Sequence, residues 1–127
     1  MIKYLVLLIT PLLANSYSVV HDAKFYSLHP KELSQALDKC PASSPSGVTC
    51  EQLNQYATRA NQLMSELHYS PQVFGQKILV LQENLAQLAL DLKQKPEAEA
   101  LQTSFNENKM QLQERLAIVK WLESPRG

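Results

Sequence analysis

The chain is poor in glycine and has no excess of charge of either sign. With only three glycines, it contains neither a phosphate-cradling loop nor a Gly-x-Ser-x-Gly nucleophile elbow. Twelve basic and twelve acidic residues cancel, so no basic stripe is available to displace counterions from nucleic acid. The same neutrality argues against a charge-driven attachment to lipid. The composition therefore favours neither phosphate chemistry nor binding to a polyanion.

A strand pattern of useful length is also missing, and no internal repeat is obvious. Instead, apolar residues recur at spacings of three and four, the period of an amphipathic helix. They predict helices over about 30–39, 50–68 and 71–93, and a fourth from 96 to the Ser124-Pro125 stop. The predicted fold class is all-α, a small antiparallel helical bundle.

The first 16 residues have the layout of a secretory signal peptide. An apolar run follows a basic residue, and the small residues Ala14 and Ser16 occupy the positions that a signal peptidase reads before Tyr17. The alternative is an uncleaved membrane anchor. A spanning helix needs about 20 apolar residues, and this run is about half as long and contains Pro11. We therefore expect cleavage, export to the periplasm or the outside of the cell, and a single helical domain over 17–127.

Two cysteines, Cys40 and Cys50, are the only ones in the chain. In an exported protein this predicts a disulfide closing the Pro-, Ser- and Gly-rich loop between them. By chain entropy, so short a loop contributes somewhat under about 3 kcal/mol. Two alternatives are free or intermolecular thiols and a zinc site completed by His29 and His68. The spacing is too long for a Cys-x-x-Cys redox motif.

Helix ends carry recognisable signals. Thr49 and Gln52 match a capping box, and Ser70 with Pro71 reads as an N-cap followed by a first-turn proline. We expect the last two helices to form a long antiparallel hairpin with the 50–68 helix packed along it. The short first helix would cover one end, held by the disulfide. Asn108 interrupts the apolar register of the last helix, either as a polar seam residue or at a kink.

Residues with catalytic potential are few. His21, His29 and His68 are isolated in the sequence, and the second and third are predicted to serve helix ends. No catalytic, cofactor-binding or metal-binding residue is therefore predicted. A small secreted hydrolase stays an alternative, and it would need a cleft where His29 or His68 meets carboxylates.

Apolar residues remain as the features suited to binding. The helical faces around Leu79 and Val80, and around Trp121, are wider than one packing seam requires. Burial of a central helix on two sides would explain them. The sharper hypothesis is that Leu79, Val80 and Trp121 form a surface for an unidentified protein partner or for a second copy, since Trp is a frequent interface anchor. A lipid-binding module is a further alternative, which the lack of basic charge does not favour.

A short pattern within residues 24–60 has a tyrosine, a His-Pro pair and two cysteines flanking a short loop. It resembles the small entry-exclusion lipoproteins of conjugative elements and related exported proteins of Gram-negative bacteria. The resemblance implies an envelope or secreted protein without known catalysis. The lipoproteins carry an acylated cysteine at the cleavage site, whereas this chain has none. The matching positions are Tyr26, His29, Pro30, Cys40 and Cys50.

Overall fold

The computed structural model describes residues 21–123, and this part of the chain is all-helical, with no strand. The predicted fold class is thus confirmed. The signal peptide and its cleavage site before Tyr17 lie outside the described residues. In chain order the helices are α1 (Ala23–Leu28), α2 (Pro30–Leu37), α3 (Cys50–Tyr69), α4 (Pro71–Gln94) and α5 (Glu99–Glu123).

Helix α1 was not predicted, because its six residues are too few to show a helical period. Its start is fixed by Asp22, whose side chain accepts a hydrogen bond from the Phe25 backbone N–H at 2.9 Å. Its end is fixed by His29, whose Nδ1 lies 2.7 Å from the Phe25 carbonyl oxygen. His29 therefore serves the end of α1, and its ring makes no cap bond to α2.

The segment between α2 and α3 matches the sequence analysis closely. The Sγ atoms of Cys40 and Cys50 lie 2.09 Å apart, at disulfide distance. Both halves of the capping box are present: the Thr49 hydroxyl accepts from the Gln52 N–H, and the Gln52 side chain accepts from the Thr49 N–H. The loop and the start of α3 are thus held by one covalent bond and two hydrogen bonds.

The ends of the C-terminal hairpin differ from the prediction in two details. Pro71 is the first residue of α4 as expected, but the Ser70 side chain makes no cap hydrogen bond. Helix α5 begins at Glu99 and not at residue 96, because Pro96 and Glu97 form the turn of the hairpin. The side chain of Gln102 closes this turn by donating to the Pro96 carbonyl oxygen at 2.7 Å.

The last helix is continuous through Asn108. The Asn108 amide donates to the Ser104 carbonyl oxygen, one turn earlier, at 2.7 Å. This bond satisfies the polar side chain within its own helix. Of the two alternatives for this position, the uninterrupted helix is correct.

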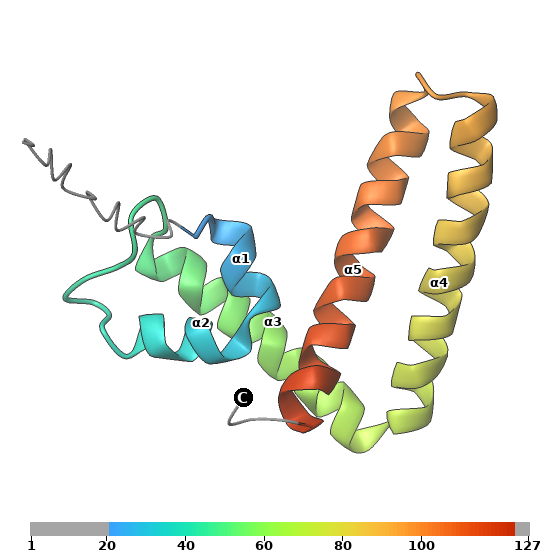
Figure 1. Ribbon diagram of the computed structural model, residues 1–127. Coiled ribbons are helices and arrows are strands. Elements are labelled where there is room, and N and C mark those ends of the chain that lie inside the picture. Colours follow the sequence, from blue (N-terminus) through green and yellow to red (C-terminus); the bar gives the residue numbers. More distant parts are fainter. Residues whose placement is uncertain (1–20, 124–127) are drawn as a thin grey trace, which may run out of the picture.

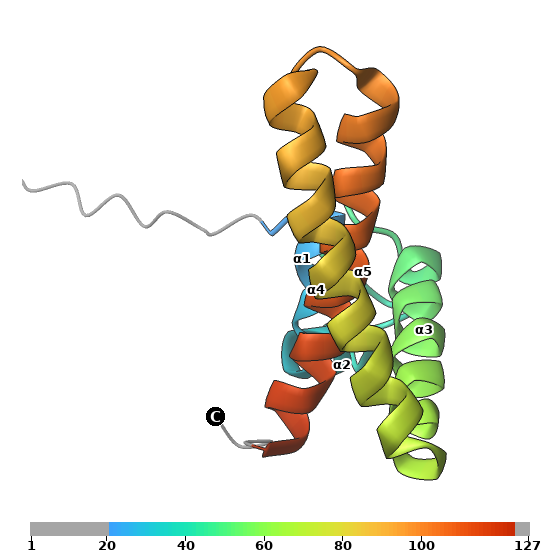
Figure 2. The ribbon, with the colours of Figure 1, turned by 90° about the vertical axis from the view of Figure 1, so that its right-hand side faces the viewer.

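Figure 1 shows two groups of helices joined by α3. The first half of α3 packs with α1 and α2 around the buried Leu53, and its second half packs on the base of the α4–α5 hairpin around Leu63 and Phe74. Helix α3 thus lies across the base of the hairpin and does not follow its length, as Figure 2 also shows. The molecule has two small cores on one shared helix.

Beyond this base the hairpin extends as a two-helix arm. From Gln82 to Glu114 no residue is buried, and the seam leucines Leu85, Leu88 and Leu92 are only half-buried. A third layer of structure is needed to bury such a seam fully. The arm therefore presents apolar surface on more than one side.

Candidate functional site

Helix α4 lies at the edge of the hairpin and carries most of the exposed large apolar side chains. Leu79 is 60% exposed and Val80 is 46% exposed, so the two predicted surface residues on this helix do face outward. Trp121, the third, is half-buried near the end of α5. Large apolar residues this exposed along one helix mark an interaction surface more often than an ordinary one. The exposed set on α4 comprises Val73, Leu79, Val80 and Leu90.

A groove of about 480 Å³ runs between α4 and α5 on one side of this set. Val80 lines it, whereas Leu79 and Trp121 do not. Its floor is aliphatic, its walls carry primary amides, and two cations lie among the lining residues. Amide side chains donate and accept, so they suit a peptide backbone or another polar chain. The lining residues are Val73, Gln76, Lys77, Val80, Leu81, Asn84, Asn108, Gln111 and Arg115.

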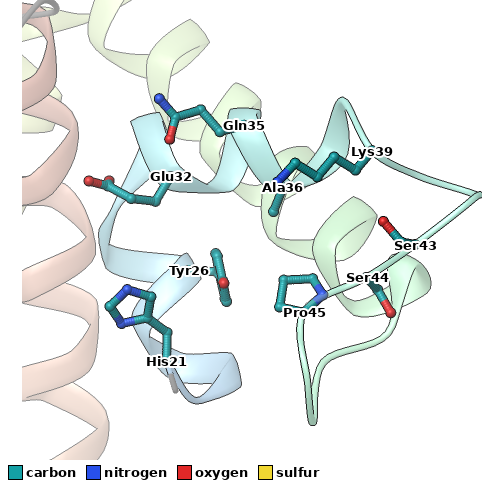
Figure 3. Close-up of a pocket in the computed structure, with 9 residues that line it drawn as sticks. All are labelled: His21, Tyr26, Glu32, Gln35, Ala36, Lys39, Ser43, Ser44 and Pro45. Atoms are coloured by element: carbon teal, nitrogen blue, oxygen red, sulfur yellow. The ribbon is translucent and has the colours of Figure 1, made fainter. Parts of the chain in front are cut away.

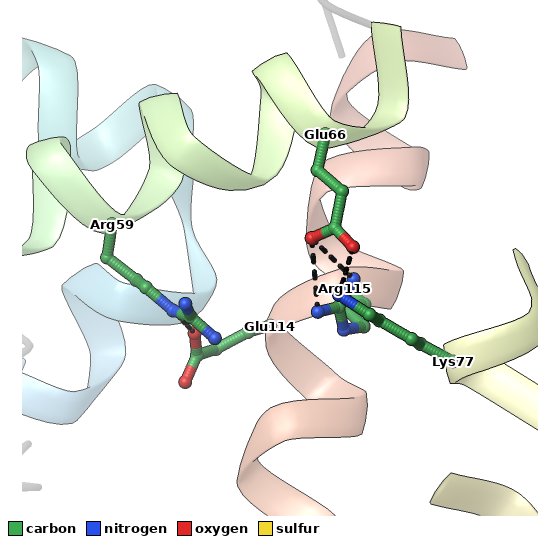
Figure 4. A network of polar contacts seen from close by, with 5 residues as sticks. All are labelled: Arg59, Glu66, Lys77, Glu114 and Arg115. Atoms are coloured by element: carbon green, nitrogen blue, oxygen red, sulfur yellow. Dashed lines mark hydrogen bonds and ion pairs between the residues drawn. The ribbon is translucent and has the colours of Figure 1, made fainter. Parts of the chain in front are cut away.

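The cations of the groove belong to a network that joins three helices (Figure 4). Glu66 of α3 receives Lys77 of α4 on one carboxylate oxygen and both terminal nitrogens of Arg115 of α5 on the other, at 3.3 Å. One carboxylate thus faces two cations, and the network keeps one net positive charge. Lys77, whose side chain is 51% exposed, is the member that a ligand in the groove can reach.

Arg115 is the buried charged residue at this junction, with 7% of its surface exposed. Its guanidinium lies 4.9 Å from the centre of the Phe74 ring, a cation–π contact, in addition to its ion pair with Glu66. The hydrogen bond from Lys77 holds the pKa of the Glu66 carboxyl below its ordinary value; partial burial opposes it, and the charge of Arg115 assists it. The network therefore keeps Glu66 ionised.

This cluster was missed by the sequence analysis. Glu66, Lys77 and Arg115 are separated by 11 and 38 residues, and each lies among other polar residues typical of a solvated face. One signal existed: Arg115 stands between the apolar Leu112 and Leu116 of the predicted seam. A second link between α3 and α5, the ion pair of Arg59 with Glu114 at 3.0 Å, is more exposed.

A separate cleft of about 420 Å³ lies between α1, α2 and the cystine loop (Figure 3). Its apolar floor is formed by the buried Tyr26 and Ala36 with the half-buried Pro45. Figure 3 shows charged and polar groups on both sides of Tyr26. The complete lining is His21, Tyr26, Glu32, Gln35, Ala36, Lys39, Ser43, Ser44 and Pro45.

The histidines of the hydrolase hypothesis do not line this cleft. The His29 ring stacks on Phe25 with centroids 3.8 Å apart, and the His68 ring packs edgewise against Tyr69. His21 does line the cleft, but its ring stacks on Phe25 at 3.5 Å, and it makes no hydrogen bond with another residue of 21–123. A nucleophile and a base within hydrogen-bond reach, which acyl transfer requires, are not paired in this part of the chain.

Residues 21–123 hold no group of three or more His, Cys, Asp or Glu side chains able to bind a metal ion. Within the same range, no helix combines the length and hydropathy that crossing a bilayer requires. No family model, curated protein or solved structure matches the chain. The resemblance to entry-exclusion lipoproteins accordingly stays a prediction.

Proposed function

We propose that this chain is an exported, non-enzymatic helical protein that binds an amphipathic helix of another protein in the groove between α4 and α5. The observation that carries the proposal is the exposed apolar surface of α4 beside that groove. Val73 and Val80 are each 46% exposed, and both line it. A helix laid along such a groove buries one apolar stripe and leaves its polar face in water.

Charge complementarity narrows the partner further. No acidic residue lines the groove, and the network at its base keeps one net positive charge because Glu66 is shared by Lys77 and Arg115. The partner helix should therefore carry a carboxylate at the end that meets Lys77. Apolar contacts would supply most of the affinity, and this pair would fix the direction in which the helix lies.

A site-specific crosslink tests this proposal. A photoreactive amino acid at Gln76, within the groove, should crosslink in the producing cells to a protein segment with apolar residues at helical spacing and an acidic residue. The same amino acid at Gln62, exposed on α3 outside the groove, is the matched control. Equal products from both positions, or products with lipid alone, would overturn the proposal.

The crosslinked segment, made as a synthetic peptide, then allows a direct affinity measurement. Val80→Ser should weaken binding about tenfold, since burying most of a valine side chain contributes roughly 1.5 kcal/mol. Lys77→Gln should weaken the peptide with its carboxylate and leave a peptide with glutamine there unchanged. Trp121→Ala tests whether the contact extends beyond the groove to the end of α5.

Export is a separate part of the proposal and has its own test. The disulfide between Cys40 and Cys50 supports an oxidising compartment. Producing cells should be fractionated into cytoplasm, periplasm, membranes and medium, and the intact mass of the protein measured. We expect a chain that begins at Tyr17 and is two hydrogens lighter than the dithiol form. Full-length chain with free thiols in the cytoplasm would refute export.

A further inference from the structure

We propose that the cleft beneath the cystine loop binds a short zwitterionic peptide of about three residues, independently of the helix-binding groove. The cleft has the form expected of a small-ligand site, an apolar floor with a few polar groups around it. Its volume of about 420 Å³ lies within the usual range for such sites, about 300–1,000 Å³.

The charged groups of the cleft are free to meet a ligand. Glu32 and Lys39 carry opposite charges, both line the cleft, and neither side chain forms an ion pair or hydrogen bond with another residue of 21–123. Gln35, between them in sequence, is likewise without such a partner in this range. A carboxylate and an ammonium that line one cleft without pairing can each bind the opposite charge of a ligand.

Spacing along the chain sets the length of the ligand. Glu32 and Lys39 are seven residues apart, two helical turns or about 10 Å of rise. An extended peptide covers about 3.3–3.6 Å per residue, so three residues separate an amino group from a carboxylate by about the same distance. A free tripeptide can therefore place its ammonium at Glu32 and its carboxylate at Lys39.

The surrounding residues agree with this orientation. Figure 3 shows Ser43 and Ser44 on the same side of Tyr26 as Lys39, with Glu32 on the other side. Two hydroxyls beside an ammonium are suitable donors for a carboxylate.

The ring of Tyr26 is only 7% exposed, so its face is not open for a sugar to stack on. The lining thus favours a peptide over a carbohydrate.

The disulfide gives the cleft a fixed wall. Ser43, Ser44 and Pro45 all belong to the loop that the Cys40–Cys50 bond closes. Ordering that loop in advance reduces the entropy lost when a ligand binds. A ligand site here would explain why a loop remote from both cores is held covalently.

Binding of trialanine to the oxidised protein tests the inference, by calorimetry or by backbone amide shifts. We expect saturable binding that amidation of the carboxylate or acetylation of the amine weakens about three- to tenfold. Lys39→Gln should weaken trialanine but not its amide, and Glu32→Gln should weaken trialanine but not its N-acetyl form. Lys31→Gln, an exposed lysine of α2 outside the cleft, is the matched control and should change nothing.

Two results would overturn this inference. One is the absence of binding at millimolar trialanine with the disulfide intact. The other is equal affinity for the free and the doubly capped peptide, since that would remove any role for the two charges. Val80→Ser, which weakens the groove, should leave trialanine binding unchanged, so the failure of one site is separable from the failure of the other.

Discussion

Replacing Glu66 by alanine should destabilise the protein far more than its exposure suggests. The substitution leaves the Arg115 guanidinium, whose side chain is 9% exposed, without the carboxylate that both its terminal nitrogens contact at 3.3 Å. Removing one partner of a buried ion pair costs about 3–5 kcal/mol, and a lost hydrogen bond to a charged group about 1.5–3 kcal/mol. Because the Glu66 side chain is 22% exposed, water can reach the site in part. We therefore expect a loss of about 2–3 kcal/mol.

The chain offers a matched control on the same pair of helices. Glu114 of α5 pairs with Arg59 of α3 at 3.0 Å, but the Arg59 side chain is 48% exposed. Glu114→Ala should therefore cost no more than about 1 kcal/mol. Both free energies come from urea unfolding followed by circular dichroism at pH 7 with the disulfide intact. Equal losses in the two variants would refute the view that burial of Arg115 makes the difference.

A second substitution separates the unpaired charge from lost packing. Arg115→Met in the Glu66→Ala background removes the unpaired charge and keeps an apolar contact for the Phe74 ring, which lies 4.9 Å from the guanidinium. Buried ion pairs are often replaced by apolar residues at little cost. The double variant should regain at least half of the lost stability. A further loss would show that Arg115 stabilises the junction mainly through its other contacts.

Three further predictions concern stability. Replacing Cys40 and Cys50 by alanine should lower the free energy of unfolding by about 2.5–3 kcal/mol for a loop of this length, measured against the oxidised protein in urea. The pKa of Glu66 is lowered on folding, so its stabilising effect is complete above the unfolded carboxyl pKa of about 4.3 and is lost as pH falls through the lower folded value. The stability difference between the wild type and Glu66→Gln should thus stay constant from pH 7 to about 5 and shrink in acid. Leu53→Ala, at a fully buried site, should cost about 2–5 kcal/mol, whereas Leu90→Ala, at a side chain 55% exposed, should change stability by less than about 0.5 kcal/mol.

The parts of the fold that were predictable from sequence depend on local chemistry. The capping box at Thr49, the first-turn prolines Pro30 and Pro71, and the disulfide between Cys40 and Cys50 all act over a few residues. Their geometry follows from residue type and spacing, so no knowledge of the tertiary structure is needed. Helix α1 failed this test because six residues give too little periodicity to detect.

The site could not be predicted in the same way, because it depends on which helices meet. Leu79 and Val80 were predicted as surface residues from a helical face wider than one seam, and both are exposed. Sequence alone did not separate them: Val80 lines the groove and Leu79 lies outside it. The contact of Glu66 with Arg115 spans 49 residues, and no local pattern encodes a contact over that separation.

The position of α3 has a consequence for how the molecule unfolds. Leu53 and Leu63, one in each core, are ten residues apart on this helix, about 15 Å along its axis. Neither core keeps its buried surface if α3 melts, so both should open in one cooperative event in which the α3 amides are the last to exchange with solvent. A ligand bound at either core would therefore slow exchange at the other, and the arm beyond Leu81 would exchange fastest.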